Sequence, residues 1–330
     1  MSDYSLIDNH RELTKMLSEL EVPIKNYEHS VTYTRGEINE DLIESLVGRI
    51  TLDLDDTCID VTQINSFQYG DNIIVVLETV SEEECYIREF KSKYIEKVNN
   101  QGATREKISL TPNDMCATDN GEVYFSDLSN KTIGRLSPSG SISRVVRTEP
   151  MLPGAICQSV DGGLLVTLRD NKSEHYNLDS HSRRIVRHIT VTGDVIREYE
   201  YQEDGQTRLF TLPVRVTQNS NSDICVVNFT SPTTGDLVIM SSSGRMKSVY
   251  CGQNLTKNFY PTDVVCDSLC NILVTDLGNK QIHLLSPDVE FFKFLLKENE
   301  VNRPCRLTLC KSTLWVGYNE GFVKVFKCKM

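Results

Sequence analysis

The sequence has no long hydrophobic run and no recognisable export signal. No apolar stretch approaches the roughly 18 residues of a membrane-spanning helix. The first ten residues, MSDYSLIDNH, are polar and acidic, whereas a secretory signal joins basic residues to an apolar run. The eleven cysteines are odd in number and irregular in spacing, which argues against a disulfide framework. We therefore predict a cytoplasmic protein that does not contact a membrane.

The chain also has no excess of basic residues. Its formal net charge is −11. Residues 1–100 contain 21 acidic and 9 basic side chains, whereas residues 101–330 contain 25 acidic and 26 basic ones. Proteins that bind nucleic acid non-specifically usually have a strongly basic face. This charge balance argues against that mode of binding.

Motifs for catalysis and for metal binding are missing as well. The chain contains no G-x-S-x-G, no G-x-x-x-x-G-K-[ST] and no H-E-x-x-H. No two cysteines have the C-x₂-C spacing of a zinc finger, and the closest pairs are Cys266/Cys270 and Cys305/Cys310. We predict no catalytic residue, no metal and no cofactor.

Leucines recur every seven residues near the start of the chain. Leu6, Leu13 and Leu20 form this line, and Pro23 ends the helix that it predicts. A helix this short is marginal alone. It either belongs to a longer coiled coil, which would allow a dimer, or packs on the rest of the protein. We assign residues 1–47 to this helical lead-in and a linker.

Internal repeats dominate the rest of the sequence. The segment from Asp127, DLSNKTIGRLSPSG, matches the segment from Asp276, DLGNKQIHLLSPD, at eight positions with one fixed offset of 149 residues. A proline also recurs, and an apolar residue follows it three positions later. These anchor prolines are spaced 41, 60, 48 and 43 residues apart: Pro112, Pro153, Pro213, Pro261 and Pro304.

Each repeat contains several short apolar strands separated by turns with Gly, Asn or Asp, as in SLCNILVTD (268–276). Units of 40–50 residues with several strands are typical of propeller blades. We count six units and predict an all-β, six-bladed β-propeller over residues 48–330. Residues 48–54, GRITLDL, are predicted to complete the last blade and close the ring. The longest repeat predicts an extended loop or hairpin at about residues 171–211.

The phrase VTDLGNKQI (274–282) resembles the signature of NHL repeats, in which a strand ends in Asp and a turn Asn precedes an Ile-led strand. A helical lead-in followed by VTYTRGEI (31–38) and a propeller resembles the junction of coiled coil and NHL propeller in TRIM-NHL ubiquitin ligases. The resemblance implies an NHL-type propeller that recognises proteins in the ubiquitin pathway. The RING and B-box of that family have no counterpart here.

Two stretches of basic residues are candidate binding sites. HSRRIVRHI (181–189) contains Arg183, Arg184 and Arg187, and SRVVR (143–147) contains Arg144 and Arg147. Both alternate as strands do, so an exposed strand face is one interpretation. The other is a patch for an acidic peptide or for RNA phosphates.

The repeated Asp and Asn residues have a structural interpretation. Asp127 and Asp276 end strands and stand three residues before Asn130 and Asn279. A carboxylate at the start of a turn accepts backbone N–H groups, and Asn tolerates a left-handed conformation. We predict that these four residues form turns; a ligand role across the central channel is the alternative.

Three functions remain after these exclusions. The first is a non-catalytic module that recognises a protein or peptide, and the second is an RNA-binding propeller. The third is a propeller enzyme of the lactonase or lyase type, which needs a metal held by His and carboxylates around the channel. The histidines are not at equivalent positions of the repeats, so the first function is preferred: His175, His181, His188 and His283.

Overall fold

The computed structural model describes residues 60–253, 257–296 and 303–329. Within these residues the chain forms 24 strands and no helix, so no helix of the described part could cross a membrane. The helix predicted in residues 1–47 lies outside the described residues.

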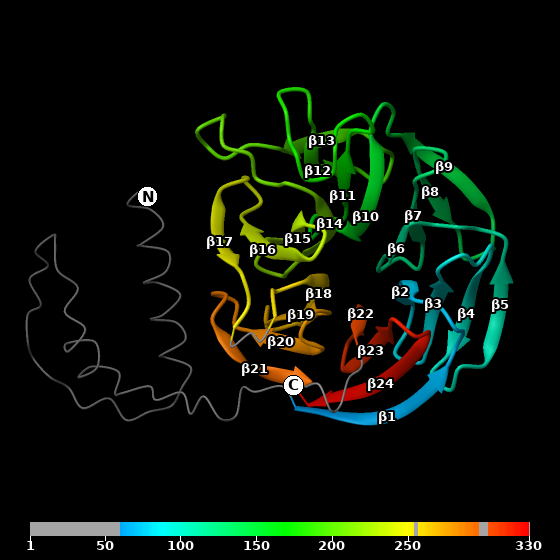
Figure 1. Cartoon of the computed structure of the whole chain (residues 1–330). Helices are drawn as coiled ribbons and strands as arrows, with labels where there is room; N and C mark the ends of the chain where they lie inside the picture. Colours follow the sequence, from blue (N-terminus) through cyan, green and yellow to red (C-terminus); the bar gives the residue numbers. More distant parts are fainter. Residues whose placement is uncertain (1–59, 254–256, 297–302, 330) are drawn as a thin grey trace, which may run out of the picture. The chain divides into compact units, whose positions relative to one another are not determined.

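The strands form six four-stranded antiparallel sheets arranged around a central channel (Figure 1). This confirms the predicted all-β, six-bladed propeller. The first blade consists of β2 (Ile74–Thr79), β3 (Glu84–Glu89), β4 (Ile95–Asn99) and β5 (Thr104–Ile108). The second consists of β6 (Asp114–Ala117), β7 (Val123–Asp127), β8 (Thr132–Leu136) and β9 (Ile142–Arg147). The third consists of β10 (Leu152–Gln158), β11 (Leu164–Arg169), β12 (Arg184–Ile189) and β13 (Val195–Tyr199). The fourth blade consists of β14 (Pro213–Gln218), β15 (Ile224–Ser231), β16 (Thr234–Met240) and β17 (Met246–Tyr250). The fifth consists of β18 (Pro261–Cys266), β19 (Ile272–Asp276), β20 (Gln281–Leu285) and β21 (Phe291–Leu296). The sixth consists of β22 (Pro304–Cys310), β23 (Thr313–Tyr318), β24 (Phe322–Lys329) and β1 (Asp60–Gln68).

The last blade contains strands from both ends of the described chain. β1 pairs antiparallel with β24, so that Asp60 lies opposite Lys329 and Gln68 lies opposite Phe322. Residues 48–54, which were predicted for this position, lie outside the described residues. The position is held by β1, a few residues further along the chain. Closing the ring in this way pairs the edge of β24, which would otherwise be open to other chains.

The hydrophobic core is a ring of six clusters, one between each pair of neighbouring blades. Because each blade packs against a neighbour on both faces, its middle strands are apolar throughout and do not alternate. Every residue of β19 and β23 is buried, whereas four of the five residues of β5 are exposed. The outer strands therefore meet solvent, and the inner strands line the channel.

The inner strands start at or near the anchor prolines. β14, β18 and β22 begin with Pro213, Pro261 and Pro304. Proline is tolerated at the first residue of an inner edge strand because no ladder bond requires its missing N–H. The prolines therefore mark the same end of the channel in successive blades.

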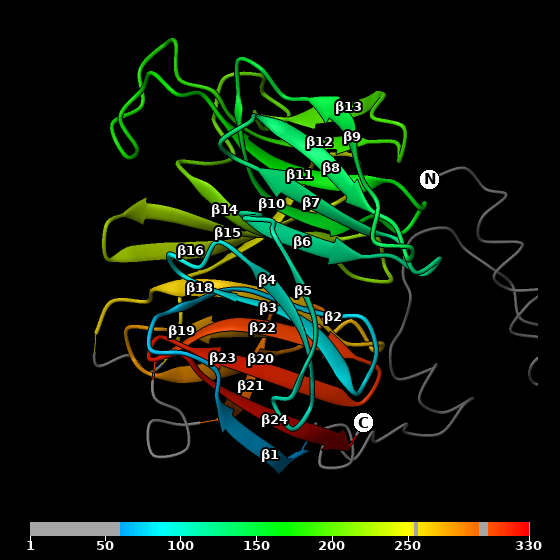
Figure 2. The same cartoon turned by 90° about the vertical axis from the view of Figure 1, so that its right-hand side faces the viewer.

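The region predicted as an extended loop or hairpin, about residues 171–211, contains two strands and two loops. β12 and β13 complete its blade, and the additional residues lie in the loops Asp170–Arg183 and Glu200–Leu212. Green loops of this blade project past the ends of its strands (Figure 2). The first of these loops reaches the candidate site.

Candidate functional site

Two arginines of the predicted patch are paired with carboxylates of the neighbouring strand. The Arg183 guanidinium lies 2.9 Å from the carboxylates of Glu198 and Glu200. Arg187 lies 2.6 Å from Glu198. Two cations against two anions leave little net charge to attract a phosphate or an acidic peptide.

Arg184, the third arginine of this stretch, is completely buried. Its guanidinium forms an ion pair with Asp170 and donates to the backbone carbonyls of Arg183 and Glu174, each at 2.9 Å. A buried side chain with these partners holds the chain in place and does not face a partner molecule.

Arg144 and Arg147 lie on β9, the outermost strand of the second blade. Both are exposed, and the Arg147 guanidinium lies 3.8 Å from the Glu149 carboxylate. The structure thus puts the five predicted arginines in three settings: surface ion pairs, a buried ion pair, and an exposed outer strand. Whether any of them binds a partner stays a prediction.

The repeated Asp and Asn residues lie in turns. Asp127 accepts hydrogen bonds from the backbone N–H of Asn130 at 2.9 Å and from its side-chain amide at 2.7 Å. Asp276 and Asn279 form the same pair, at 3.1 and 2.7 Å. The left-handed conformation falls on the next residue, with φ of +51° at Lys131 and +57° at Lys280. Because each Asn side chain bonds back to its Asp, the chain reverses one position later.

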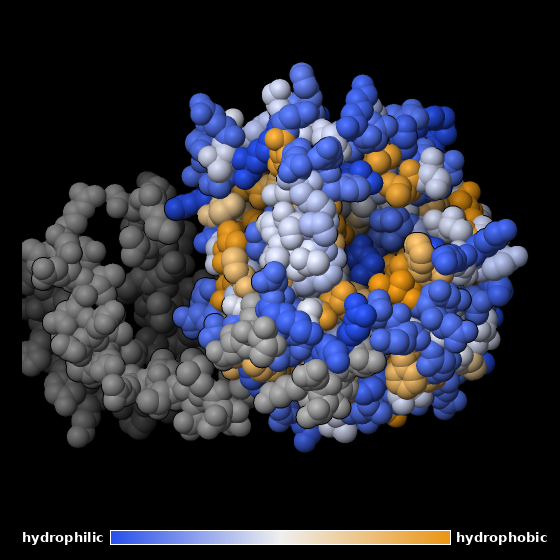
Figure 3. Space-filling view, in the orientation of Figure 1, coloured by the Kyte–Doolittle hydropathy of each residue, from blue (hydrophilic) through white to orange (hydrophobic). Residues whose placement is uncertain are grey.

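A constellation of charges lies in the central channel, on the first and second strands of several blades. A cavity of about 540 Å³ opens at the end where the inner strands begin, and we call it the arginine pocket. Its polar lining comes from four arginines, one histidine, two tyrosines, two threonines, an asparagine and a cysteine: Arg88, Arg169, Arg215, Arg306, His175, Tyr176, Tyr260, Thr167, Thr262, Asn113 and Cys305. Within the part of the chain that the structure describes, no Asp or Glu lines it. In Figure 3, hydrophobic side chains surround a recess near the middle of the propeller, with hydrophilic atoms inside.

Four charged residues cross the channel at the base of this pocket, and we call them the channel ring: Asp114, Arg215, Asp263 and Arg306. The Arg215 guanidinium lies 3.7 Å from Asp114 and 3.6 Å from Asp263. Burial raises the pKa of Asp263, and Arg215 and Arg306 oppose this shift. Burial also lowers the pKa of Arg306, and the charge of Arg215 lowers it further. The two guanidiniums thus repel each other while the two aspartates compensate them.

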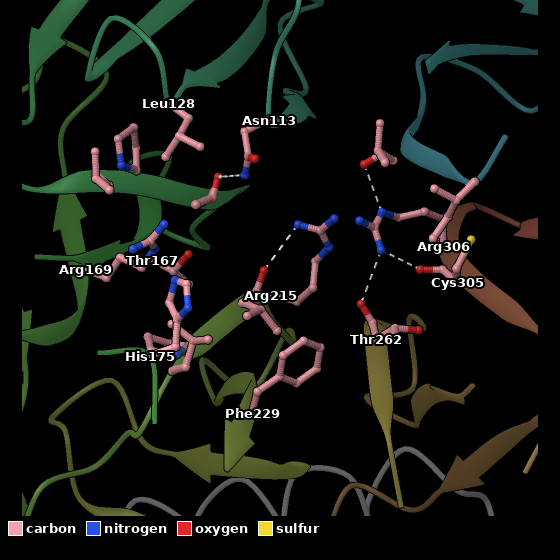
Figure 4. Close-up of a pocket in the computed structure, with 18 of the residues that line it drawn as sticks. Asn113, Leu128, Thr167, Arg169, His175, Arg215, Phe229, Thr262, Cys305 and Arg306 are labelled. Atoms are coloured by element: carbon pink, nitrogen blue, oxygen red, sulfur yellow. Dashed lines mark hydrogen bonds between the residues drawn. The ribbon is translucent and has the colours of Figure 1, made fainter. Parts of the chain in front are cut away.

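Donor atoms in this pocket are left without hydrogen-bond acceptors among the described residues. Arg215 is 7% exposed, and its Nε makes no hydrogen bond. The Arg88 Nε is also buried and unbonded, although its terminal nitrogen donates to the Pro112 carbonyl at 2.7 Å. Arg169 is half-buried, and burial lowers the pKa of its guanidinium. Figure 4 shows the side chains of Arg215 and Arg306 reaching toward each other, whereas Arg169 and His175 lie on the side of Arg215 that is away from Arg306.

One side of the pocket is aromatic. Phe229 lies on β15, where it pairs with Gly235 of β16, and its ring centroid lies 4.9 Å from that of Tyr260. Tyr176 comes from the loop Asp170–Arg183, and its ring lies beside that of His175 at 6.1 Å. Burial and the proximity of Tyr176 raise the pKa of Tyr260. The pocket thus combines guanidiniums on its floor with aromatic rings on one wall.

A second cavity, of about 630 Å³, lies at the opposite end of the channel, where the inner strands finish. Its lining includes four carboxylates and four thiols: Glu78, Asp114, Asp119, Asp263, Cys116, Cys157, Cys266 and Cys310. Burial raises the pKa of the Cys116, Cys157 and Cys310 thiols, and a hydrogen bond with Cys225 together with burial raises that of Cys266. The raised pKa values keep these thiols protonated and unreactive. In the described part of the chain, no group of three His, Cys, Asp or Glu is arranged to hold a metal.

The channel ring has a signal in the sequence, which is visible only when the residues that follow the anchor prolines are compared. Each ring residue stands two positions after an anchor proline: Asp114, Arg215, Asp263 and Arg306. In a propeller the same repeat position occupies the same depth of the channel, so charges at one position must face one another. His175 had no such signal, because it lies in the loop that only the third blade possesses.

Comparisons with known proteins agree on the fold. No family model matches the chain, and no curated protein matches it. Among solved structures, a streptogramin B lyase is similar with a TM-score of 0.56 at 16% identity, covering 82% of this chain and 98% of that one. A gluconolactonase from Xanthomonas campestris has a TM-score of 0.60 at 8% identity, with 82% and 89% covered. A PQQ-bound aldose sugar dehydrogenase from Streptomyces coelicolor has a TM-score of 0.58 at 10% identity, with 82% and 99% covered.

These structures correct the prediction that the chain is not an enzyme. That prediction rested on missing motifs and on the resemblance to ligase propellers, whereas the similar solved structures are a lyase, a lactonase and a dehydrogenase. Missing motifs were a weak guide, because propeller sites are assembled from separate blades and leave no contiguous signature. At these identities the likeness shows the fold alone, so the chemistry must be argued from this chain's own residues.

Replacing Arg184 should destabilise the protein, because Asp170 would lose the ion-pair partner that compensates its charge. We expect Arg184→Ala to lower the free energy of unfolding by about 3–5 kcal/mol, the usual cost of breaking a buried ion pair from one side. Urea denaturation would measure it. Arg144→Ala, on the exposed outer strand, is the matched control and should leave the midpoint unchanged. Equal effects of the two substitutions would contradict the structural role of Arg184.

Glu78 should make stability fall as the pH rises. Burial raises the pKa of Glu78 to about 8 against an ordinary value of 4.5, with Asp114 and Asp263 adding to the shift and the Ala117 N–H opposing it. Between these values the folded protein holds a proton that the unfolded chain has released, so the free energy of unfolding decreases with pH. Denaturation from pH 5 to 8 should show this decrease, and Glu78→Gln should reduce it. An unchanged slope in the variant would contradict this role.

Proposed function

We propose that this propeller binds a small organic anion in the arginine pocket. The observation that carries the proposal is the excess of positive charge in the lining: four arginines and, among the described residues, no carboxylate line one cavity of about 540 Å³. Cavities of this size hold small molecules, and guanidiniums bind carboxylates and phosphates through paired N–H donors.

The channel ring supports the proposal by fixing where the anion would bind. Asp114 and Asp263 balance Arg215 and Arg306, which leaves Arg88 and Arg169 as net positive charge above the ring. Arg169 makes no hydrogen bond or ion pair through its guanidinium within the described residues. A ligand carboxylate or phosphate between Arg169 and the ring would satisfy donors that the protein leaves open.

Recognition of RNA or of a protein, which the TRIM-NHL resemblance implies, stays a prediction. The arginines from which it was argued are largely neutralised, since Arg183 and Arg187 are paired with Glu198 and Glu200. The arginine pocket is a recess in the channel and accepts a side chain, a chain end or a small molecule more readily than a nucleic-acid strand.

Binding should depend on the anionic group and on Arg169. We expect 2-naphthoate to bind the wild-type chain in calorimetry and its uncharged methyl ester to bind far more weakly. Arg169→Met should weaken binding of the acid by about tenfold or more, because a hydrogen bond to a charged group is lost. It should change the melting temperature little, because the attraction of Arg169 to Asp170 is opposed by its repulsion from Arg184. Arg147→Met, on an outer strand, is the control, and equal binding of acid and ester would contradict the proposal.

Turnover of the bound anion is a second candidate function, favoured by the position of His175. Its imidazole lines the arginine pocket, and an ordinary histidine can take or give a proton near neutral pH. Next to a bound carboxylate, the guanidiniums would stabilise negative charge that develops when a neighbouring carbon loses its proton. Loss of a proton from the carbon next to a carboxylate is a step of elimination and isomerisation reactions.

His175→Gln separates turnover from binding. We expect a panel of α,β-substituted carboxylic acids, followed by NMR, to reveal product with the wild-type chain, and the variant to lose product formation while still binding the acids. Loss of both would assign His175 to binding. No product from any acid with the wild-type chain would contradict this second candidate and leave the binding proposal intact.

A further inference from the structure

The loop Asp170–Arg183 distinguishes the third blade from the other five. In the other blades the connection between the second and third strands is short, as in residues 128–131 or 277–280. Those short turns contribute Leu128 and Leu277 to the rim of the arginine pocket. In the third blade the longer loop contributes His175 and Tyr176 to the same pocket. The equivalent turn of the first blade contributes Phe90, so the loop adds two rings at a rim where each of these short turns supplies a single side chain.

Both ends of this loop are fastened by buried polar groups. Asp170 accepts the backbone N–H groups of Lys172, Ser173 and Arg183 at 2.7–2.9 Å. Burial opposes ionisation of Asp170, but these donors outweigh it and lower its pKa. The buried Arg184 pairs with Asp170 and donates to the Glu174 carbonyl at 2.9 Å. The residue directly before His175 and Tyr176 is thus fixed, so the two rings are held over the pocket.

Tyr176 adds to an aromatic wall that other blades begin. Phe229 from the fourth blade and Tyr260 at the start of the fifth blade lie 4.9 Å apart between ring centroids, at an interplanar angle of 35°. Tyr176 lies close enough to Tyr260 for its hydroxyl to affect the ionisation of that residue. Three aromatic rings from three blades therefore converge on one side of a cavity that has guanidiniums on its floor.

This arrangement is specific in its chemistry. Aromatic faces attract other rings beyond the effect of buried area, and guanidiniums stack on rings as well as binding anions. A purely aliphatic wall would serve a saturated acid equally well, and Leu128 and Leu277 already supply one at the rim. The rings are useful only if the ligand has a flat, unsaturated part.

We propose that the ligand of the arginine pocket is an aromatic anion, with its ring against Tyr176, Phe229 and Tyr260, and that Tyr176 is the residue that selects it. The proposal rests on the proposed function, because it takes the anion site as given. It adds the class of ligand and assigns a purpose to the additional loop of the third blade.

The test compares a flat acid with its saturated counterpart. Calorimetry on the full chain would measure 2-naphthoate and decahydro-2-naphthoate, which have the same charge and carbon skeleton. We expect the wild-type chain to prefer 2-naphthoate by about tenfold, the upper range of a favourable ring pair. Tyr176→Ala should remove most of this preference while it retains binding of the saturated acid. Tyr176→Phe should restore it, and the exposed Tyr94→Ala is the matched control.

The possible outcomes separate the two proposals. Equal binding of the two acids by the wild-type chain, or an unchanged preference in Tyr176→Ala, would overturn the aromatic inference and leave the anion site intact. Absence of binding for both acids would overturn the anion site itself, and the inference with it. A preference that Tyr176→Ala abolishes and Tyr176→Phe retains would support both.

Discussion

The neutralisation of buried charge across the central channel is the constraint on which the rest of this propeller depends. Two guanidiniums and two carboxylates cannot leave water separately without a large cost, so they must face one another. Arg215 reaches Asp114 and Asp263, which ties the second, fourth and fifth blades together. Asp114 also accepts the N–H of Ile156 at 3.0 Å, which adds the third blade.

The remaining two blades join through the same ring. Asp263 accepts the N–H of Leu307 in the sixth blade at 3.0 Å, and Arg306 donates to the Val75 carbonyl of the first blade at 2.9 Å. The ring therefore connects all six blades at the axis, where the hydrophobic clusters between blades do not reach. It also divides the channel into a cationic end and an end of carboxylates and thiols.

The fold was predictable from the sequence because its signals repeat. Blades stack on both faces, so their middle strands are continuous apolar runs, and VTDLGNKQI and LWVGY are recognisable without any structure. Six units with this pattern admit few other architectures. The strand that closes the ring was harder to place, because a strand at the chain's edge has no partner in its own repeat, and β1 lies six residues after the predicted segment 48–54.

The site was not predictable in the same way, since it depends on how blades face one another. The dense run of arginines at 181–189 predicted a binding site there. In the fold, Glu198 of β13 and Glu200 directly after it form ion pairs with Arg183 of this run. Arg215 and Arg306 are isolated in the sequence and meet only when the ring closes (Figure 4). A run of basic residues is therefore a poor guide to a binding site in an antiparallel blade, because acidic residues of the neighbouring strand can neutralise its charge.

Function in such a fold must arise where the six blades differ, because identical blades would give an identical lining on every side. Two departures from symmetry meet in the arginine pocket. One is the residue two positions after each anchor proline, which is an aspartate in two repeats, an arginine in two and an alanine in the third. The other is the loop Asp170–Arg183, which only the third blade has among the described connections of this kind. The first departure supplies the channel ring, which joins the blades at the axis, whereas the loop belongs to the third blade alone. The ring has a structural role at the axis, so it is the loop, with His175 and Tyr176 above the ring arginines, that supports the proposed binding site.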